Sequence, residues 1–324
     1  MKLESNILIC GDNLEIMKKL YEQHGSFIDL IYIDPPFCSN RNYNVKSSSS
    51  KNKKGFEDKW SGGLESYLPW LTERIQWMHK LLKDTGSIFV HLDWHAVHYV
   101  KVEMDKIFGA ENYKNHLVWI YSKSSRGAKS KSQQFARNND DILFYQKTQS
   151  ALFNNIITYK RFTHEEALKA GFRQDEHNRW FKTSPRGDYS DESIAKLDKE
   201  GRIYKTNTGS VRIKYFLETE GKYILEKINV GNCWDDIPDM MHVSKDEKLG
   251  YPTQKPEMLL ERIFKAATGE GDTVADFFSG SGTTIAVAQK LGRRWIGVDQ
   301  NPDAIQITAD RIEQISKQKE KPIN

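Results

Sequence analysis

The stretch from Leu30 to Phe37 constrains the fold of this chain more than any other. It opens with four consecutive apolar or aromatic residues, Leu30–Ile33. A run without polar alternation is typical of a strand that is buried on both faces, as in a parallel sheet. An aspartate, two prolines and a phenylalanine then end the strand. Because open α/β sheets bind ligands at the carboxyl ends of their strands, we predict that Asp34 lies in a functional site.

The tetrapeptide Asp34–Phe37 carries groups that can activate an exocyclic amine. The amine of adenine or cytosine is a weak nucleophile, since its lone pair is delocalised into the ring. If the Asp34 carboxylate and the Pro35 carbonyl each accept one amine hydrogen, the lone pair is directed at an electrophile without a strong base. Pro35 and Pro36 are rigid, and Phe37 offers a face on which a base can stack. We therefore predict a catalytic role for all four residues; the alternative is a structural turn in which Asp34 is a cap and Phe37 fills the core.

A second stretch, Thr273–Thr284, reads as a strand, a tight glycine turn and the start of a helix. Arg294–Asp299 reads as the next strand. This order is typical of a nucleotide-binding βαβ unit, in which glycines admit a ligand close to the backbone and an acidic residue after the next strand bonds a ribose. The dinucleotide fingerprint needs Gly or Ala three residues after Gly282, where this chain has Ile285. The pattern favours a nucleoside cofactor over a nicotinamide dinucleotide.

Together, Asp34–Phe37 and the glycine motif Phe278–Gly282 resemble the β class of amino-group DNA methyltransferases that use S-adenosylmethionine. Gly11–Leu14 and Tyr251–Pro256 extend the resemblance. It implies an α/β, Rossmann-like methyltransferase fold with a seven-stranded, mostly parallel sheet, in the permuted order with the target-amine motif before the cofactor motif. In this order the strands that carry Asp34 and Gly280 are expected to be neighbours, so that the two motifs meet, and residues 116–121 and 140–146 are expected to form a hairpin at one edge of the sheet. In that family an aspartate at the first tetrapeptide position usually accompanies adenine N6, and a serine accompanies cytosine N4. Phe37 replaces the commoner tyrosine and should still stack.

The resemblance also implies a binding site for S-adenosylmethionine. Asp12 would face the adenine of the cofactor, and it also fits as the N-cap of a helix over residues 14–21. Lys255 would pair with the carboxylate of the cofactor's methionine. The residues expected to bind the cofactor are Asp12, Asn13, Lys255, Asp276, Phe278, Ser279, Gly280, Ser281, Gly282, Thr283, Thr284, Asp299 and Gln300.

The activity implied by the resemblance is site-specific methylation of adenine N6 in duplex DNA, with the target base flipped out of the stack. Cytosine N4 methylation uses the same geometry, and a catalytically silent DNA-binding partner subunit is a further alternative. RNA is a less favoured substrate. Double-stranded DNA is the expected partner, and a homodimer and a cognate restriction endonuclease are further expectations.

Two basic stretches are candidates for DNA contacts. Residues 38–59 follow the tetrapeptide and are rich in Ser, Asn and Lys, and residues 122–131 contain no acidic residue. Composition predicts flexible loops that either contact phosphates or remain solvated. The residues expected to contact DNA there are Arg41, Tyr43, Lys123, Arg126 and Lys129.

The chain is predicted to form a methyltransferase domain with one insertion. Residues 1–147 would be the catalytic half, 148–230 a target-recognition insertion, and 231–324 the cofactor-binding half. The resemblance covers residues 1–147 and 231–315 and leaves the insertion uncovered, so a structural or dimerising insertion is the alternative. The candidate base or phosphate readers in the insertion are Arg173, Arg179, Lys182 and Arg186.

Composition sets the remaining limits. The 324 residues carry a net charge of +4, which is compatible with a polyanionic partner. Three cysteines without a pairing pattern, the lack of a membrane-spanning apolar run and an amino terminus unlike a signal peptide predict a soluble, cytoplasmic protein. No metal site is expected, because no cysteine pair or His-Glu-x-x-His frame accompanies the histidines of residues 91–98.

Overall fold

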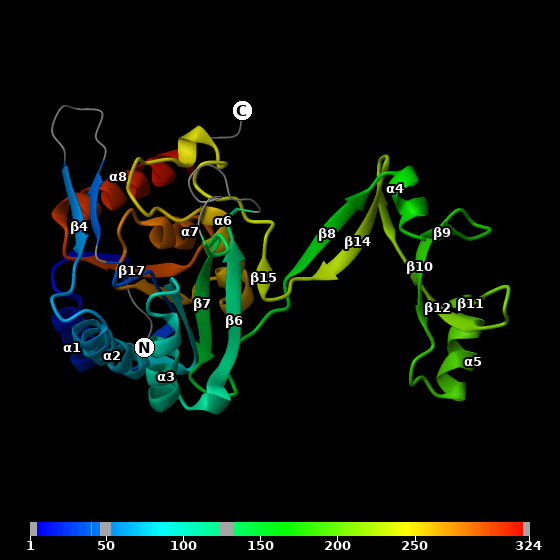
Figure 1. The fold of residues 1–324 in the computed structure, drawn as a ribbon, viewed down its shortest axis with the longest axis horizontal. Coiled ribbons are helices and arrows are strands. Elements are labelled where there is room, and N and C mark those ends of the chain that lie inside the picture. Colours follow the sequence, from blue (N-terminus) through cyan, green and yellow to red (C-terminus); the bar gives the residue numbers. More distant parts are fainter. Residues whose placement is uncertain (1–4, 40, 46–52, 123–132, 320–324) are drawn as a thin grey trace. The chain divides into compact units, whose positions relative to one another are not determined.

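The computed structural model describes residues 5–39, 41–45, 53–122 and 133–319 (Figure 1). The chain forms two compact units. The first combines residues 1–154 with 231–324, and the second comprises Asn155–Val230. The second unit lies within the range 148–230 that was expected to be an insertion, and begins seven residues later than expected.

The first unit is built on a mostly parallel sheet. In the described part of the chain its strand order is β1-β17-β16-β2-β5-β7-β6-β15. Only β7 runs antiparallel to its neighbours β5 and β6, and all other neighbouring pairs are parallel. The strands are β1 (Ile7–Cys10), β2 (Ile28–Ile33), β5 (Leu82–Leu92), β6 (Tyr113–Ile120), β7 (Asn139–Gln146), β15 (Cys233–Trp234), β16 (Thr273–Asp276) and β17 (Arg294–Asp299).

The sheet contains the seven predicted strands and one more. The additional strand is β15, which pairs with β6 through Cys233 and Trp234. The β6–β7 hairpin was expected at the edge of the sheet, and this was wrong because β15 lies outside it. A strand of two residues is too short to leave a recognisable apolar run in the sequence.

Two layers of helices cover the sheet (Figure 1). Helices α1, α2 and α3 pack against one another on one face, and α6, α7 and α8 on the other. In α2 the buried residues Leu71, Ile75 and Met78 recur at helical spacing and pack into the same core as Ile31 and Ile33 of β2. The helices are α1 (Asn13–His24), α2 (Leu64–Leu81), α3 (Val97–Phe108), α6 (Glu257–Ala267), α7 (Thr283–Lys290) and α8 (Pro302–Lys319), with 3-10 turns η1 (Ala110–Asn112) and η3 (Lys245–Glu247).

Strands β2 and β16 are direct neighbours, paired at Leu30 with Val274 and at Ile31 with Ala275. The chain leaves β2 toward α2 on one face of the sheet and leaves β16 toward α7 on the other (Figure 1). Diverging crossovers at adjacent strands open a crevice at their carboxyl ends. This confirms the prediction that the aspartate motif and the glycine motif meet.

The segment after Phe37 differs from the prediction. Composition predicted a flexible loop over residues 38–59, whereas β3 (Arg41–Val45) and β4 (Lys53–Asp58) form an antiparallel hairpin. Its end is fixed by the buried carboxylate of Asp58, which accepts hydrogen bonds from the backbone N–H groups of Phe37, Cys38 and Ser39. Cross-strand backbone pairing and a single buried cap outweigh a polar composition here.

The second unit contains two small antiparallel sheets, of order β11-β12-β10-β9 and β13-β14-β8. Phe162, Phe172, Trp180 and Ile224 form its apolar core with Ala167. Its elements are β8 (Ile157–Phe162), α4 (His164–Lys169), β9 (Arg173–Gln174), β10 (Trp180–Pro185), α5 (Asp191–Lys199), β11 (Ile203–Lys205), β12 (Val211–Phe216), β13 (Glu218–Glu220) and β14 (Tyr223–Asn229).

Two smaller findings complete the fold. Helix α8 continues through the polar residues from Ser316 as far as Lys319. Among the helices of the described residues, none has both the length and the apolar character needed to cross a membrane.

Candidate active site

A cavity of about 310 Å³ lies at the carboxyl ends of β2 and β16. This volume is at the lower end of the range for small-molecule sites. Of the thirteen residues expected to bind a cofactor, all line the cavity except Gly282, and of the tetrapeptide Asp34 and Pro36 line it. The remaining lining residues are Gly11, Tyr32, Lys59, Trp60, Trp70, Arg74, Tyr251, Thr253, Leu260 and Phe277.

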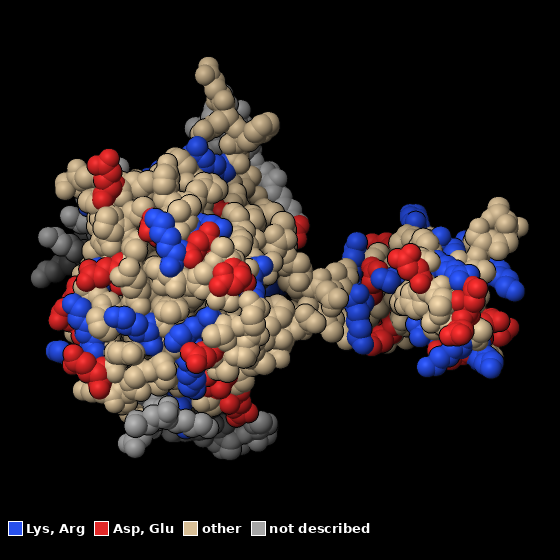
Figure 2. Space-filling view, turned by 90° about the horizontal axis from the view of Figure 1, so that it is seen from below, with Lys and Arg blue, Asp and Glu red and all other residues tan. Residues whose placement is uncertain are grey.

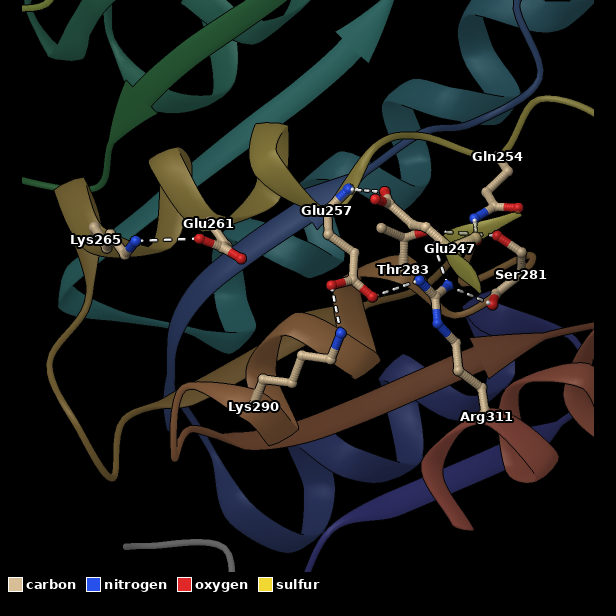
Figure 3. A network of polar contacts seen from close by, with 9 residues as sticks. All are labelled: Glu247, Gln254, Glu257, Glu261, Lys265, Ser281, Thr283, Lys290 and Arg311. Atoms are coloured by element: carbon tan, nitrogen blue, oxygen red, sulfur yellow. Dashed lines mark hydrogen bonds and ion pairs between the residues drawn. The ribbon is translucent and has the colours of Figure 1, made fainter. Parts of the chain in front are cut away.

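The glycine loop between β16 and α7 is held by hydrogen bonds from both sides. Gly280 N–H donates to Asp299 Oδ2 over 2.8 Å, which ties the loop to the end of β17. Behind the loop, the buried guanidinium of Arg311 donates to the Ser281 carbonyl and to Thr283 Oγ1, both over 3.2 Å (Figure 3). The loop is therefore a preformed wall of the cavity.

Asp276 is a fully buried acid at the base of this loop. Its carboxylate accepts hydrogen bonds from Thr284 Oγ1 over 2.5 Å and from Phe278 N–H over 2.9 Å. Burial nevertheless raises the pKa of Asp276 to about 7, and the nearby carboxylates of Asp34 and Asp299 add to the effect. Burial also raises the pKa of Asp299.

The raised pKa of Asp276 predicts a pH-dependent stability. The folded chain retains this proton up to a pH of about 7, whereas the unfolded chain loses it near pH 4, so this contribution to stability is lost as the pH rises from about 4 through about 7. Asp276→Asn mimics the protonated acid. We expect it to gain stability relative to the wild type by as much as about 2–3 kcal/mol between pH 5 and pH 8. Denaturant unfolding without cofactor at both pH values measures this difference.

The control for this experiment is Asp310→Asn, which removes an exposed carboxylate on α8. We expect its stability difference from the wild type to be the same at both pH values. An Asp276→Asn difference that does not change with pH contradicts the assignment of a buried, protonated acid.

Asp34 follows β2 directly, and the structure distinguishes its two carboxylate oxygens. Oδ2 accepts a hydrogen bond from Lys255 Nζ over 2.5 Å. Oδ1 is buried and has no hydrogen-bond partner among the described residues. The same is true of Ser279 Oγ on the glycine loop. Both residues line the cavity. Buried acceptors in a native protein normally have a partner, so Asp34 and Ser279 have unused hydrogen-bonding capacity at the cavity, whereas Tyr67 Oη and Ser87 Oγ, which also lack a partner, belong to residues outside its lining.

Phe37 is held by a buried chain of polar groups. Its ring stacks on His91 with an interplanar angle of 17°. His91 in turn contacts Tyr32 Oη over 2.8 Å and Asp140 Oδ2 over 3.1 Å. Burial opposes ionisation of Asp140, but the hydrogen bond from His91 and the charge of Lys255 outweigh it and lower the pKa of Asp140. Phe37 and Pro35 do not line the cavity itself.

Comparison with known proteins identifies the family. A family model described as DNA methylase (N6_N4_Mtase) matches residues 28–310. The chain belongs to this DNA methylase family. The type II methyltransferase M.EcaI of Enterobacter cloacae is 28% identical to this chain over 320 residues, and the match covers 91% of this chain and 67% of that protein. The DNA adenine methyltransferase YhdJ of Escherichia coli K12 is 27% identical over 312 residues, 96% of this chain and 83% of that protein.

Solved structures confirm the predicted fold class. An M1.HpyAVI–SAM complex matches the methylase with a TM-score of 0.53 and 16% identity over 94% of this chain and 98% of that one. The cytosine-N4-specific PvuII DNA methyltransferase matches with a TM-score of 0.56 and 16% identity over 97% and 91%. At this identity the structures establish a common α/β methyltransferase fold.

The predicted DNA contacts are less well defined in the methylase than the cavity. Arg41 is exposed at the start of β3, and the side chain of Tyr43 lies outside the described residues, as do Lys123, Arg126 and Lys129. In the second unit, each candidate reader has a partner: Arg173 bonds Tyr204, Arg179 bonds Asp175, Lys182 bonds Glu226 and Arg186 bonds Asp191. On the face shown in Figure 2, basic and acidic side chains are interspersed.

Sequence reasoning missed several residues that shape the site. Arg74 of α2 donates to Asn13 Oδ1 over 2.7 Å and lies 4.1 Å from the Trp70 ring centroid, and Trp70 packs against Phe278. Asp12 fulfils its predicted capping role by accepting from Leu14 N–H, and it lines the cavity as well. An arginine within the apolar stripe of α2 was the available signal, because a buried cation needs a partner.

Two of the histidines of residues 91–98 contact aspartates. His91, near the end of β5, lies in the buried chain described above, and His95 Nδ1 contacts Asp93 Oδ2 over 2.7 Å. Within the described residues, no group of three or more His, Cys, Asp and Glu side chains is arranged to hold a metal ion.

Proposed function

We propose that this methylase transfers a methyl group from S-adenosylmethionine to N6 of an adenine flipped out of duplex DNA. The observation that carries the proposal is the buried, unpartnered Oδ1 of Asp34, which lines the same cavity as the glycine loop. An acceptor for an amine hydrogen is thus placed beside a wall suited to a nucleoside cofactor.

The charges of the cavity fit this cofactor. Four aspartates line it against three basic residues. Two of those aspartates are paired, Asp12 with Arg74 and Asp34 with Lys255, whereas Asp276 and Asp299 accept hydrogen bonds from neutral donors. Asp276 holds its proton up to about pH 7, and two of the three cations are paired with carboxylates, so the site has little free positive charge with which to bind the pyrophosphate of a dinucleotide.

Individual side chains have capacity for the polar groups of the cofactor. Asp299 accepts backbone hydrogen bonds and still has lone pairs for a ribose hydroxyl. Ser279 Oγ is a further free donor and acceptor in the cavity wall. The bound sulfonium would supply the methyl group, with an N–C bond forming at the target amine as the S–C bond breaks.

The protein's part in the reaction is to hold the amine. Asp34 Oδ1 accepts one amine hydrogen and the Pro35 carbonyl accepts the other, so that the nitrogen lone pair points at the methyl group. Phe37 stacks on the base, and the surplus proton leaves to water after transfer. Aspartate at position 34 and the likeness to the E. coli adenine methyltransferase support adenine over cytosine.

The test is to express the chain in a methylation-free host and to sequence the host genome by a method that reports modified bases. We expect N6-methyladenine within one short sequence motif. N4-methylcytosine alone would retain the fold and mechanism and overturn the base assignment, and the fold shared with the PvuII enzyme makes this the second candidate. No modification at all would favour a silent DNA-binding subunit. A restriction partner, suggested by the type II designation of M.EcaI, would be sought among proteins that cleave the same motif.

A further inference from the structure

Lys255 and Asp34 form an ion pair in the wall of the cavity. Their side chains are 9% and 17% exposed, and Nζ lies 2.5 Å from Oδ2. Lys255 Nζ also donates to the Thr253 carbonyl over 3.5 Å and lies 5.3 Å from the centroid of the Phe37 ring. The resemblance assigned Lys255 to the carboxylate of the cofactor, whereas in the structure its ammonium is bonded to the proposed catalytic aspartate.

Residues on both sides of Lys255 are held by hydrogen bonds to Glu247 (Figure 3). On one side, Gln254 Nε2 donates to the Glu247 carbonyl over 2.6 Å. On the other, Glu257 N–H donates to Glu247 Oε1 over 2.7 Å. Glu247 therefore clamps the segment that carries Lys255 at both ends.

The same segment is tied to the glycine loop. The Glu257 carboxylate accepts from Lys290 Nζ over 2.5 Å and from Arg311 over 2.8 Å (Figure 3). Arg311 also bonds Ser281 and Thr283 of the loop. Burial opposes ionisation of Glu257, but these two cations lower its pKa, so the network stays charged. The segment that carries Lys255 is thus held in a fixed position relative to the glycine loop, and the Lys255 ammonium binds Asp34.

An ion pair in this position has a geometric effect. A buried carboxylate without a compensating cation is costly, and it responds by taking up a proton or by rotating toward another donor. Either response removes the acceptor at Oδ1. A cation bound to Oδ2 holds the carboxylate in place and leaves Oδ1 as the oxygen without a partner.

We propose that Lys255 is a positioning residue for methyl transfer, which holds Oδ2 of Asp34 so that Oδ1 accepts a hydrogen of the target amine. The inference rests on the proposed function, and it adds a role that the aspartate motif alone does not contain. The reverse role, in which the ammonium occupies the place of the amine and inhibits transfer, predicts instead that Lys255→Met is faster than the wild type.

The test compares Lys255→Met with wild type in single-turnover methylation of DNA. We expect the rate of transfer to fall about 100-fold, as for a comparable misplacement of a reacting group, with the affinities for DNA and S-adenosylmethionine nearly unchanged. Lys255→Arg should recover part of the rate.

Two controls separate positioning from general damage. Lys265→Met removes another lysine of a carboxylate pair, with Glu261, from the exposed side of α6, and should retain wild-type rate (Figure 3). In an Asp34→Asn background, Lys255→Met should have little further effect on the rate, because it acts through Asp34. Thermal unfolding and calorimetric cofactor binding show whether each variant is folded.

Three results overturn the inference. A wild-type or faster rate in Lys255→Met refutes positioning, and a loss of cofactor affinity equal to the loss of rate returns Lys255 to the cofactor. Additive effects in the Asp34→Asn background refute action through Asp34. If instead the wild-type protein methylates no DNA, the proposed function fails before Lys255 is tested.

Discussion

Asp34→Ala is expected to reduce the rate of methyl transfer by about 100- to 1000-fold while the affinity for S-adenosylmethionine changes little. The variant removes the acceptor at Oδ1, and losing one preorganised hydrogen-bonding group at a reacting centre commonly costs this much. It also leaves the Lys255 ammonium without the partner that it has over 2.5 Å. Single-turnover assays with DNA measure the rate, and calorimetry measures cofactor binding.

Asp29→Asn is the matched control for this prediction. Asp29 lies at the opposite end of β2, where its carboxylate pairs with Lys83 over 2.8 Å and accepts from Thr273 N–H over 2.9 Å. We expect this control to lower the melting temperature and to preserve the rate of the folded enzyme. Wild-type turnover in Asp34→Ala would remove this aspartate from the mechanism.

The carboxyl edge of the sheet is predictable from sequence because its signals are local. Leu30–Ile33 is uniformly apolar and proves to be buried in the centre of the sheet, and the glycine motif lies between a strand and a helix as expected. These local signals place a ligand site at the carboxyl end of each strand, whereas the pairing of β2 with β16, which joins Leu30 to Val274, is a long-range contact that the resemblance to the methyltransferase family supplied.

The supports of the site are not predictable in the same way, because their partners are distant in the chain. Asp58 caps a turn about twenty residues earlier, Arg74 reaches Asn13, and Arg311 reaches Glu257. Asp58 and Arg311 read in the sequence as further surface charges, and only the position of Arg74 within the apolar stripe of α2 indicates burial. The fold shows that all three are buried groups, each with a hydrogen-bond partner in another segment of the chain.

The same limit applies to Lys255. Its sequence neighbourhood suggested a cofactor contact, and the residue that it bonds lies 221 positions away. Strand β15 and the β3–β4 hairpin escaped prediction for a related reason, since their pairing depends on backbone hydrogen bonds that composition does not record.

Gly280→Val is expected to weaken S-adenosylmethionine binding by about 100-fold or more. Gly280 lines the cavity with a φ of +49°, and a Cβ added there would lie 3.5 Å from Tyr251 Cε1, which is ordinary contact. The valine side chain therefore has few close contacts with the protein and occupies space in the cavity. Overpacking of this kind costs about 1–3 kcal/mol, and the positive φ adds backbone strain. Calorimetric titration with the cofactor measures the loss.

Gly282→Ala separates a blocked cavity from a damaged fold. Gly282 does not line the cavity, and its added Cβ would lie 2.5 Å from Thr308 Oγ1 on α8, at a φ of +72°. We expect this variant to lose thermal stability first and cofactor affinity only in consequence, whereas Gly280→Val should lose affinity at a melting temperature closer to that of the wild type. Normal cofactor affinity in a folded Gly280→Val protein would show that the cofactor does not approach the backbone at this loop, and the glycine motif would then be a structural turn alone.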